Sequence, residues 1–148
     1  TRHDVPPEML ILEVTETTAM SNPDESVRVL TELTNAGVKA SIDDFGTGYS
    51  SLLYLKPLPA SELKIDRAFV QELSGESEDA TIVSAIVALA KTLNLKVVAE
   101  GVETEAQQTF LTELGCHTLQ GYLLGKPVSA QTIEALCEHG EMLPGAEV

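Results

Sequence analysis

Short runs of aliphatic residues alternate with longer stretches of helical periodicity along this 148-residue chain. The short runs predict strands, and the longer stretches predict amphipathic helices because their apolar residues recur every three or four positions. The clearest helix is expected over residues 78–93, with Ile82, Ile86, Leu89 and Leu93 on its buried face. A last helix is expected after Pro127, through Ile133 and Leu136. The predicted strands cover residues 9–14, 38–43, 62–66, 96–100 and 118–120, and the first of them is expected to be buried.

Strands that alternate with helices indicate an α/β fold of parallel βα units with right-handed crossovers. A (β/α)₈ barrel of the TIM type takes about 250 residues, so this chain has room for about five units. Two architectures remain open at this point: an open five-stranded sheet, or the last five-eighths of an incomplete barrel. We expect one domain over residues 1–139 and a flexible tail over 140–148.

The charge of the chain restricts its partners. Lys and Arg number 9 against 23 Asp and Glu, a formal net charge of −14. Direct binding of DNA, RNA or an anionic membrane is not expected, because the chain lacks the basic surface that replaces phosphate counterions. The chain contains two cysteines, no signal-peptide pattern and no apolar run long enough to cross a membrane. We therefore expect a cytoplasmic domain, in a parent protein with or without a membrane anchor.

Nearly every predicted strand ends in a carboxylate. Because the carboxyl ends of parallel strands meet at one edge of a sheet, these side chains are expected to share one rim with a single lysine, Lys64. Such a density of negative charge requires cations, and oxygen ligands without His or thiolate favour Mg²⁺, Mn²⁺ or Ca²⁺. The alternative is that each carboxylate only caps the helix after it. The carboxylates in question are Glu13, Glu16, Asp43, Asp44, Asp66, Glu100 and Glu103.

The segment Asp43-Asp44-Phe45-Gly46-Thr47-Gly48-Tyr49-Ser50-Ser51-Leu52 resembles the signature loop of EAL-domain cyclic di-GMP phosphodiesterases. Four further blocks match in order, and together they cover nearly the whole chain. They are Glu13-Val14-Thr15-Glu16, Leu63-Lys64-Ile65-Asp66-Arg67, Val98-Ala99-Glu100-Gly101-Val102-Glu103-Thr104 and Gln120-Gly121-Tyr122-Leu123. The resemblance implies a modified (β/α)₈ barrel that linearises cyclic di-GMP to pGpG with Mg²⁺ or Mn²⁺.

The resemblance also implies roles for individual residues. Lys64, Glu100 and Gln120 are similar to the family's catalytic residues: Lys64 holds or polarises the attacking water and Gln120 orients water or ligand. Whether Lys64 or Glu100 is the base stays open. Glu16 resembles the residue that tethers the loop after Asp44, a loop that the family uses to couple dimerisation to metal binding. The implied metal ligands are Glu13, Asp43, Asp44 and Glu100, the supporting residues are Asp66 and Glu103, and the loop residues are Phe45, Gly46, Thr47, Gly48, Tyr49, Ser50 and Ser51.

One part of the family pattern does not occur in this chain. The signature Glu-Ala-Leu strand and the Asn-bearing strand after it would precede residue 1, so we expect the C-terminal portion of an EAL domain that hydrolyses cyclic di-GMP poorly or not at all by itself. The resemblance implies a homodimer and a GGDEF or sensory domain upstream. Two alternatives are a receptor that binds cyclic di-GMP or a protein without turnover, and a fragment that folds by pairing its open strand edge.

Overall fold

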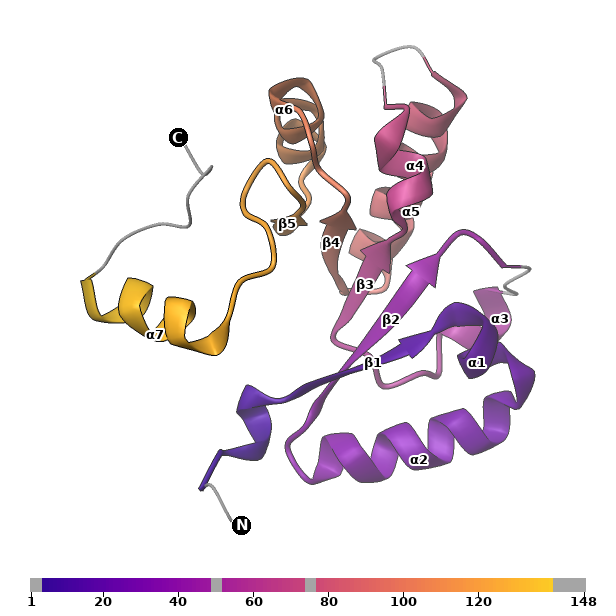
Figure 1. Ribbon diagram of the computed structural model, residues 1–148. Coiled ribbons are helices and arrows are strands. Elements are labelled where there is room, and N and C mark those ends of the chain that lie inside the picture. The colour runs from indigo at the N-terminus through magenta and orange to yellow at the C-terminus, as the bar shows by residue number, and fades with distance from the viewer. Residues whose placement is uncertain (1–3, 49–51, 74–76, 140–148) are drawn as a thin grey trace.

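The computed structural model describes residues 4–48, 52–73 and 77–139. Its centre is one sheet of five parallel strands whose order in space is their order in the chain, as Figure 1 shows. The strands are β1 (Ile11–Thr15), β2 (Lys39–Phe45), β3 (Glu62–Ile65), β4 (Lys96–Glu100) and β5 (Thr118–Gln120). The predicted α/β fold with five parallel units is confirmed.

Helices connect consecutive strands, as parallel pairing requires. Local signals in the sequence account for their ends. Asn22 precedes Pro23 at the start of α2, and Thr104 with Gln107 forms a capping box at the start of α6. Gly115 ends α6 with a φ of 94°, a conformation that glycine adopts without strain. The helical elements are η1 (Pro7–Met9), α1 (Glu16–Ser21), α2 (Pro23–Asn35), α3 (Leu52–Leu55), α4 (Arg67–Gln71), α5 (Glu78–Thr92), α6 (Glu105–Leu114) and α7 (Ala130–His139).

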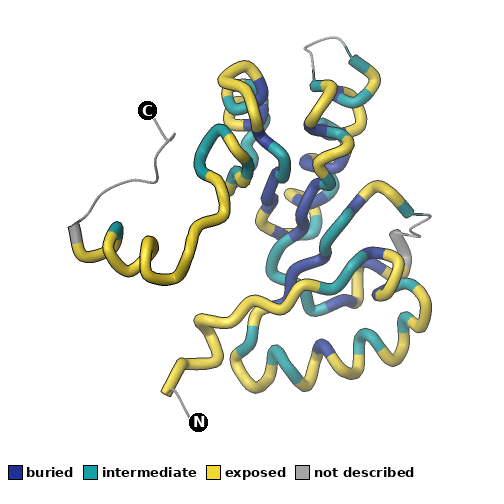
Figure 2. Tube along the Cα trace, in the orientation of Figure 1, coloured by how far each residue is buried: buried dark blue, intermediate teal, exposed yellow. Residues whose placement is uncertain are grey.

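The hydrophobic core lies between the central strands and the helices that cover them (Figure 2). Leu63 and Ile65 of β3 are fully buried, as are Val97 and Ala99 of β4. The helix α5 packs on both of these strands. No helix in the described part of the chain has both the length and the apolar character needed to cross a membrane.

Two expectations at the N-terminal side are wrong. Residues Pro7–Met9 form a 3₁₀ turn, in which the amide of Leu10 donates to the carbonyl of Pro7 over 2.9 Å, so the first strand starts only at Ile11. The strand is also exposed: Ile11 and Leu12 keep 47% and 44% of their surface accessible. The reason is position, because β1 is an edge strand with a neighbour on one side only.

Other boundaries also differ from the sequence-based expectation. The short helices α1 and α4 follow β1 and β3 directly, and the apolar pattern did not predict them. Phe45, expected in the loop, is the last residue of β2 and is buried. In α5 the buried stripe runs through Val83, Ile86, Val87 and Ala90, whereas Ile82 is exposed. That helix is apolar on more than one face, so periodicity alone could not select the buried one. The predicted tail, 140–148, lies outside the described residues.

The final helix stands apart from the sheet (Figure 1). It follows a segment without regular structure, residues 121–129, and every residue of Ala130–Glu138 except Leu136 is exposed. Ile133 keeps 43% of its surface accessible. The sequence thus correctly predicts an amphipathic helix here, but its apolar face has little to pack against in the part of the chain that the structure describes.

Candidate metal and catalytic site

Lys64 lies at the centre of the site. Its side chain is 6% exposed, and its ammonium nitrogen is 2.6 Å from Glu100 Oε1, 2.8 Å from Glu13 Oε1 and 3.2 Å from Asp43 Oδ1. The four residues come from four consecutive strands, β1 to β4. Parallel pairing brings their carboxyl ends to one rim, so one buried ammonium contacts three carboxylates that are distant in sequence.

The surroundings of Lys64 decide its protonation. Burial disfavours the ammonium, but the hydrogen bonds to Glu100 and Glu13 and the charge of Glu100 outweigh it, so the pKa of Lys64 is raised. An amine in this environment keeps its proton at neutral pH. Without a cation at the rim, Lys64 is therefore suited to donate hydrogen bonds and to supply positive charge.

A bulge at the end of β2 places two successive carboxylates at the site. Consecutive strand residues normally point to opposite faces. Here the register with β3 shifts between Ile42 and Phe45, and Asp44 adopts a φ of 54°. Oxygens of Asp43, Asp44 and Glu100 consequently lie within 4.8 Å of one another. A positive φ is uncommon outside glycine, so the backbone at Asp44 carries strain at the place where two successive carboxylates approach Glu100.

These three residues fit a divalent cation. A group of acidic, His or Cys side chains can hold a metal ion only if their ligand atoms lie close together. Within residues 4–48, 52–73 and 77–139, one group meets this condition, and it consists of Asp43, Asp44 and Glu100. Their donors are all hard carboxylate oxygens, which suit Mg²⁺, Mn²⁺ or Ca²⁺. Burial raises the pKa of Asp44, and the neighbouring carboxylates Asp43, Asp66 and Glu100 raise it further. Negative charge therefore remains in excess despite Lys64, and a cation would relieve it.

The structure places Glu16 beneath the loop after β2. Glu16 is 2% exposed, and its Oε2 accepts a hydrogen bond from the amide of Gly46 over 2.8 Å. A Cβ added at Gly48 would come within 3.1 Å of the same carboxylate, so the loop passes close over Glu16. Of the other loop residues, Thr47 donates from its hydroxyl to the carbonyl of Asp44, while Tyr49, Ser50 and Ser51 lie outside the described residues.

The remaining predicted residues lie in three different surroundings. Asp66 caps α4 by accepting from the amide of Ala68 over 2.7 Å, and its carboxylate is close enough to Asp44 to raise the pKa of that residue. Neither Glu103 nor Gln120 is among the described partners of the Lys64 ammonium, which are Glu13, Asp43 and Glu100. Glu103 and Gln120 line a neighbouring cavity of about 210 Å³ that Glu100 borders. Glu13 binds Lys64 but is not one of the three carboxylates grouped around the candidate cation position.

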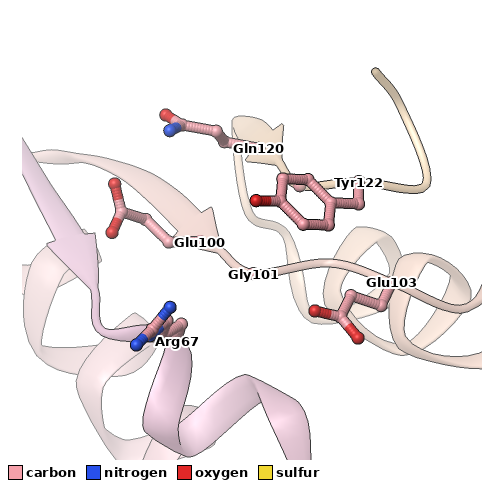
Figure 3. A pocket seen from close by; sticks show the side chains of 7 residues that line it. Arg67, Glu100, Gly101, Glu103, Gln120 and Tyr122 are labelled. Atoms are coloured by element: carbon pink, nitrogen blue, oxygen red, sulfur yellow. The ribbon is translucent and has the colours of Figure 1, made fainter. Parts of the chain in front are cut away.

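This cavity also contains side chains to which sequence reasoning gave no role. They are Arg67 and Tyr122, and Figure 3 shows both of them around the cavity with Glu103. Gly101 allows this arrangement, because a Cβ there would lie 2.6 Å from the Cβ of Arg67. None of the ion pairs among the described residues involves Arg67. Its place directly after Asp66 in a matching block was the only available signal.

Gln107 fixes the walls of the cavity. This buried amide donates to the carbonyls of Val70 and Gln71 over 2.8 and 3.2 Å, and it accepts from the amides of Glu103 and Thr104 over 2.8 and 3.0 Å. It therefore joins the end of α4 to the start of α6. The capping-box spacing Thr104-x-x-Gln107 was the signal in the sequence, but its link to α4 is a tertiary contact.

Comparison with known proteins decides the family. The family model described as "EAL domain" matches residues 1–127. The chain belongs to the EAL domain family. It is 67% identical over 134 residues to the bifunctional diguanylate cyclase/cyclic di-GMP phosphodiesterase MucR of Pseudomonas aeruginosa, covering 90% of this chain and 20% of MucR. It is 50% identical over 125 residues to the cyclic di-GMP phosphodiesterase NbdA of the same organism, covering 84% of this chain and 16% of NbdA.

Solved EAL structures have the same fold. A cyclic di-GMP complex of the MucR phosphodiesterase matches with a TM-score of 0.86 at 67% identity, over 89% of this chain and 53% of that one. The EAL domain of Mycobacterium smegmatis DcpA matches with a TM-score of 0.87 at 43% identity, over 95% and 63%. A manganese/cyclic di-GMP complex of Klebsiella pneumoniae BlrP1 matches with a TM-score of 0.74 at 37% identity, over 83% and 31%. This EAL chain thus spans part of the length of each.

Proposed function

We propose that this EAL chain is the C-terminal part of a phosphodiesterase domain that hydrolyses cyclic di-GMP to linear pGpG with Mg²⁺ or Mn²⁺. The observation that carries the proposal is the convergence of Asp43, Asp44, Glu100 and Lys64 at the ends of three strands. Relatives named as cyclic di-GMP phosphodiesterases, and related structures with this nucleotide and with manganese, support it.

The residues divide the work as follows. Asp43, Asp44 and Glu100 would hold the cation, with Glu13 beside them. When bound, the cation neutralises the phosphodiester and lowers the pKa of a water molecule. Lys64 donates hydrogen bonds at the same rim and holds the three strand ends at hydrogen-bonding distance. Either Lys64 or Glu100 would accept the proton of that water.

The cavity next to the carboxylates supplies groups that can bind a nucleotide. The guanidinium of Arg67 is able to pair with a phosphate through two parallel hydrogen bonds. The amide of Gln120 can both donate and accept, and the ring of Tyr122 offers a face on which a base can stack. These functions are consistent with a dinucleotide lying across the rim with one phosphate at the cation.

The isolated chain is expected to turn over cyclic di-GMP poorly or not at all, because the signature strand and the Asn-bearing strand would supply further ligands. The wider context is also part of the proposal: a cytoplasmic domain, a homodimer and an upstream GGDEF domain. The bifunctional name of the relative MucR supports that upstream domain.

Product analysis tests the proposal. Cyclic di-GMP is incubated with Mn²⁺ and either this chain or a longer protein that includes the preceding strands, and the nucleotides are separated by chromatography. We expect pGpG from the longer protein and little or none from the 148-residue chain. A longer protein that binds the nucleotide and releases it uncut would instead be a receptor. Rates from the short chain equal to those of the longer protein would refute the need for the missing strands.

A further inference from the structure

Lys64 is buried, and no other lysine or arginine among the described residues is. The other ion pairs formed by described residues join Arg28 to Glu25 and Glu32 on the exposed surface of α2. Those pairs lie within one helix, whereas Lys64 joins three other strands. The position of Lys64 is thus set by the tertiary structure, and its ammonium is the point at which the ends of β1, β2 and β4 meet.

The ligands of this ammonium overlap with the candidate cation ligands. Asp43 and Glu100 contact Lys64 at 3.2 and 2.6 Å, and the same two residues form the carboxylate group with Asp44. The side chains of Asp43 and Glu100 are 20% and 19% exposed, so solvent screens their charge only in part. Positive charge at either place therefore reduces the attraction for positive charge at the other.

We propose that Lys64 is an internal counter-ion of the metal carboxylates, which holds the ends of β1, β2 and β4 together and competes with a divalent cation for their negative charge. The inference rests on the proposed metal site and adds a role that hydrolysis alone does not require. Lys64 is here a positioning residue: it acts on the cation through Asp43 and Glu100.

Two consequences follow from removing its charge while keeping its length, as in Lys64→Met. Without a cation, the carboxylates lose the ammonium that compensates them and repel one another, so the protein becomes less stable. With a cation, the competitor is gone and the site is one unit more negative, so the cation binds more tightly. Lys64→Arg keeps the charge and is expected to keep affinity for the cation close to wild type.

The experiment measures Mn²⁺ binding by titration calorimetry and the melting temperature in EDTA and in Mn²⁺ for the full 148-residue chain. Lys39→Met is the control, because Lys39 is also a strand lysine but is exposed and lies at the opposite end of β2. We expect Lys64→Met to melt lower than the control in EDTA, to regain most of that loss in Mn²⁺, and to bind Mn²⁺ at least about tenfold more tightly than wild type.

Equal or weaker Mn²⁺ binding by Lys64→Met overturns the inference, and so does a variant as stable in EDTA as Lys39→Met. If Lys64→Met is unfolded in EDTA, folding on addition of Mn²⁺ supports the inference. Failure of both Lys64→Met and the hydrogen-bonding Lys64→Gln to fold in either condition contradicts it. If the proposed metal site does not exist, the result is different. In that case neither the wild type nor any variant gives a heat of binding or a shift in melting temperature with Mn²⁺.

Discussion

The centre of the sheet and its edges are built from similar residues but differ in what covers them. In β3, at the centre, Leu63 and Ile65 are fully buried and even the charged Lys64 is 5% exposed. In β1, at one edge, Ile11 and Leu12 are nearly half exposed. Both strands are short and combine aliphatic with polar residues. The centre is covered by strands on both sides and by α5, whereas β1 has one neighbouring strand.

This difference shows that burial here depends on neighbours more than on the residues themselves. An edge strand presents unpaired backbone groups and, in this chain, aliphatic side chains that suit a further strand. A cavity of about 300 Å³ beside β1, lined by Val14, Val29 and Leu30 among others, adds to the uncovered apolar surface. The site spans both regions, since Glu13 on β1 is 49% exposed and Asp43 and Glu100 are about 20% exposed.

The largest expected effect compares a leucine at the centre with one at the edge. Leu63→Ala removes a fully buried side chain and is expected to lower the free energy of unfolding by about 2–5 kcal/mol. Leu12→Ala, at 44% exposure, is expected to cost less than about 1 kcal/mol. Urea unfolding followed by circular dichroism measures both. Equal losses would mean that β1 is covered in solution, for example by pairing with a second copy of the chain.

The next effect concerns β5, the strand at the other edge of the sheet, and its contact with the loop after β4. Gly121 follows β5, and a Cβ there would overlap the carbonyl oxygen of Val102, which is backbone and cannot rotate away. Gly121→Ala should therefore push the end of β5 from the loop after β4 and destabilise the protein by about 1–3 kcal/mol.

Thr118→Ala, at an exposed position of the same strand, is the matched control and is expected to change stability by less than about 0.5 kcal/mol. Thermal unfolding of the two variants provides the measurement. A Gly121→Ala variant as stable as the control would show that the β5 edge shifts freely relative to β4.

The sequence could predict the elements whose signals are local. The five strands, the capping residues and the carboxylates at strand ends are all visible in short segments, and parallel pairing then implies that Glu13, Asp43 and Glu100 meet. The exposure of β1 could not be predicted, because it depends on a missing neighbour. The bulge at Asp44 depends on register with β3, and no local pattern encodes it. The position of Arg67 in the cavity could not be predicted either, because it depends on the close approach of Gly101, in the loop between β4 and α6, to Arg67.

A smaller loss is expected from the amide that joins α4 to α6. Gln107→Met keeps the shape of the side chain but leaves the carbonyl of Val70 and the amides of Glu103 and Thr104 without this partner. An unpaired buried polar group lowers the free energy of unfolding by about 1–3 kcal/mol. Water can reach the partly buried amides of Glu103 and Thr104, so we expect a loss near the lower end, about 1 kcal/mol.

Gln108→Met is the matched control, at the next and less buried position of α6. Hydrogen exchange gives a readout that global stability does not: the amides of Glu103 and Thr104 should lose protection in Gln107→Met and keep it in Gln108→Met. Unchanged protection in both variants would show that the capping hydroxyl of Thr104 holds the turn without Gln107.

The smallest effect depends on pH and separates the two successive carboxylates of β2. The folded pKa of Asp44 is raised, by burial first and then by Asp43, Asp66 and Glu100. A raised carboxyl pKa means that the folded protein binds the proton more tightly than the unfolded chain does. Stability is therefore lost as the pH rises from the unfolded value, about 3.9, through the raised folded value. Asp44→Asn removes this loss and tolerates the φ of 54°.

In EDTA, Asp44→Asn should be more stable than wild type at neutral pH, by less than about 1 kcal/mol because solvent screens the partly exposed group. The gain should shrink toward zero as the pH falls below about 4. Asp43→Asn is the informative contrast, because Asp43 is a partner of Lys64 at 3.2 Å and its loss should destabilise the protein at neutral pH. Urea unfolding between pH 3.5 and 7.5 distinguishes the two. If both variants lose stability, Asp44 also depends on Lys64, and the negative charge at the end of β2 is balanced without any added cation.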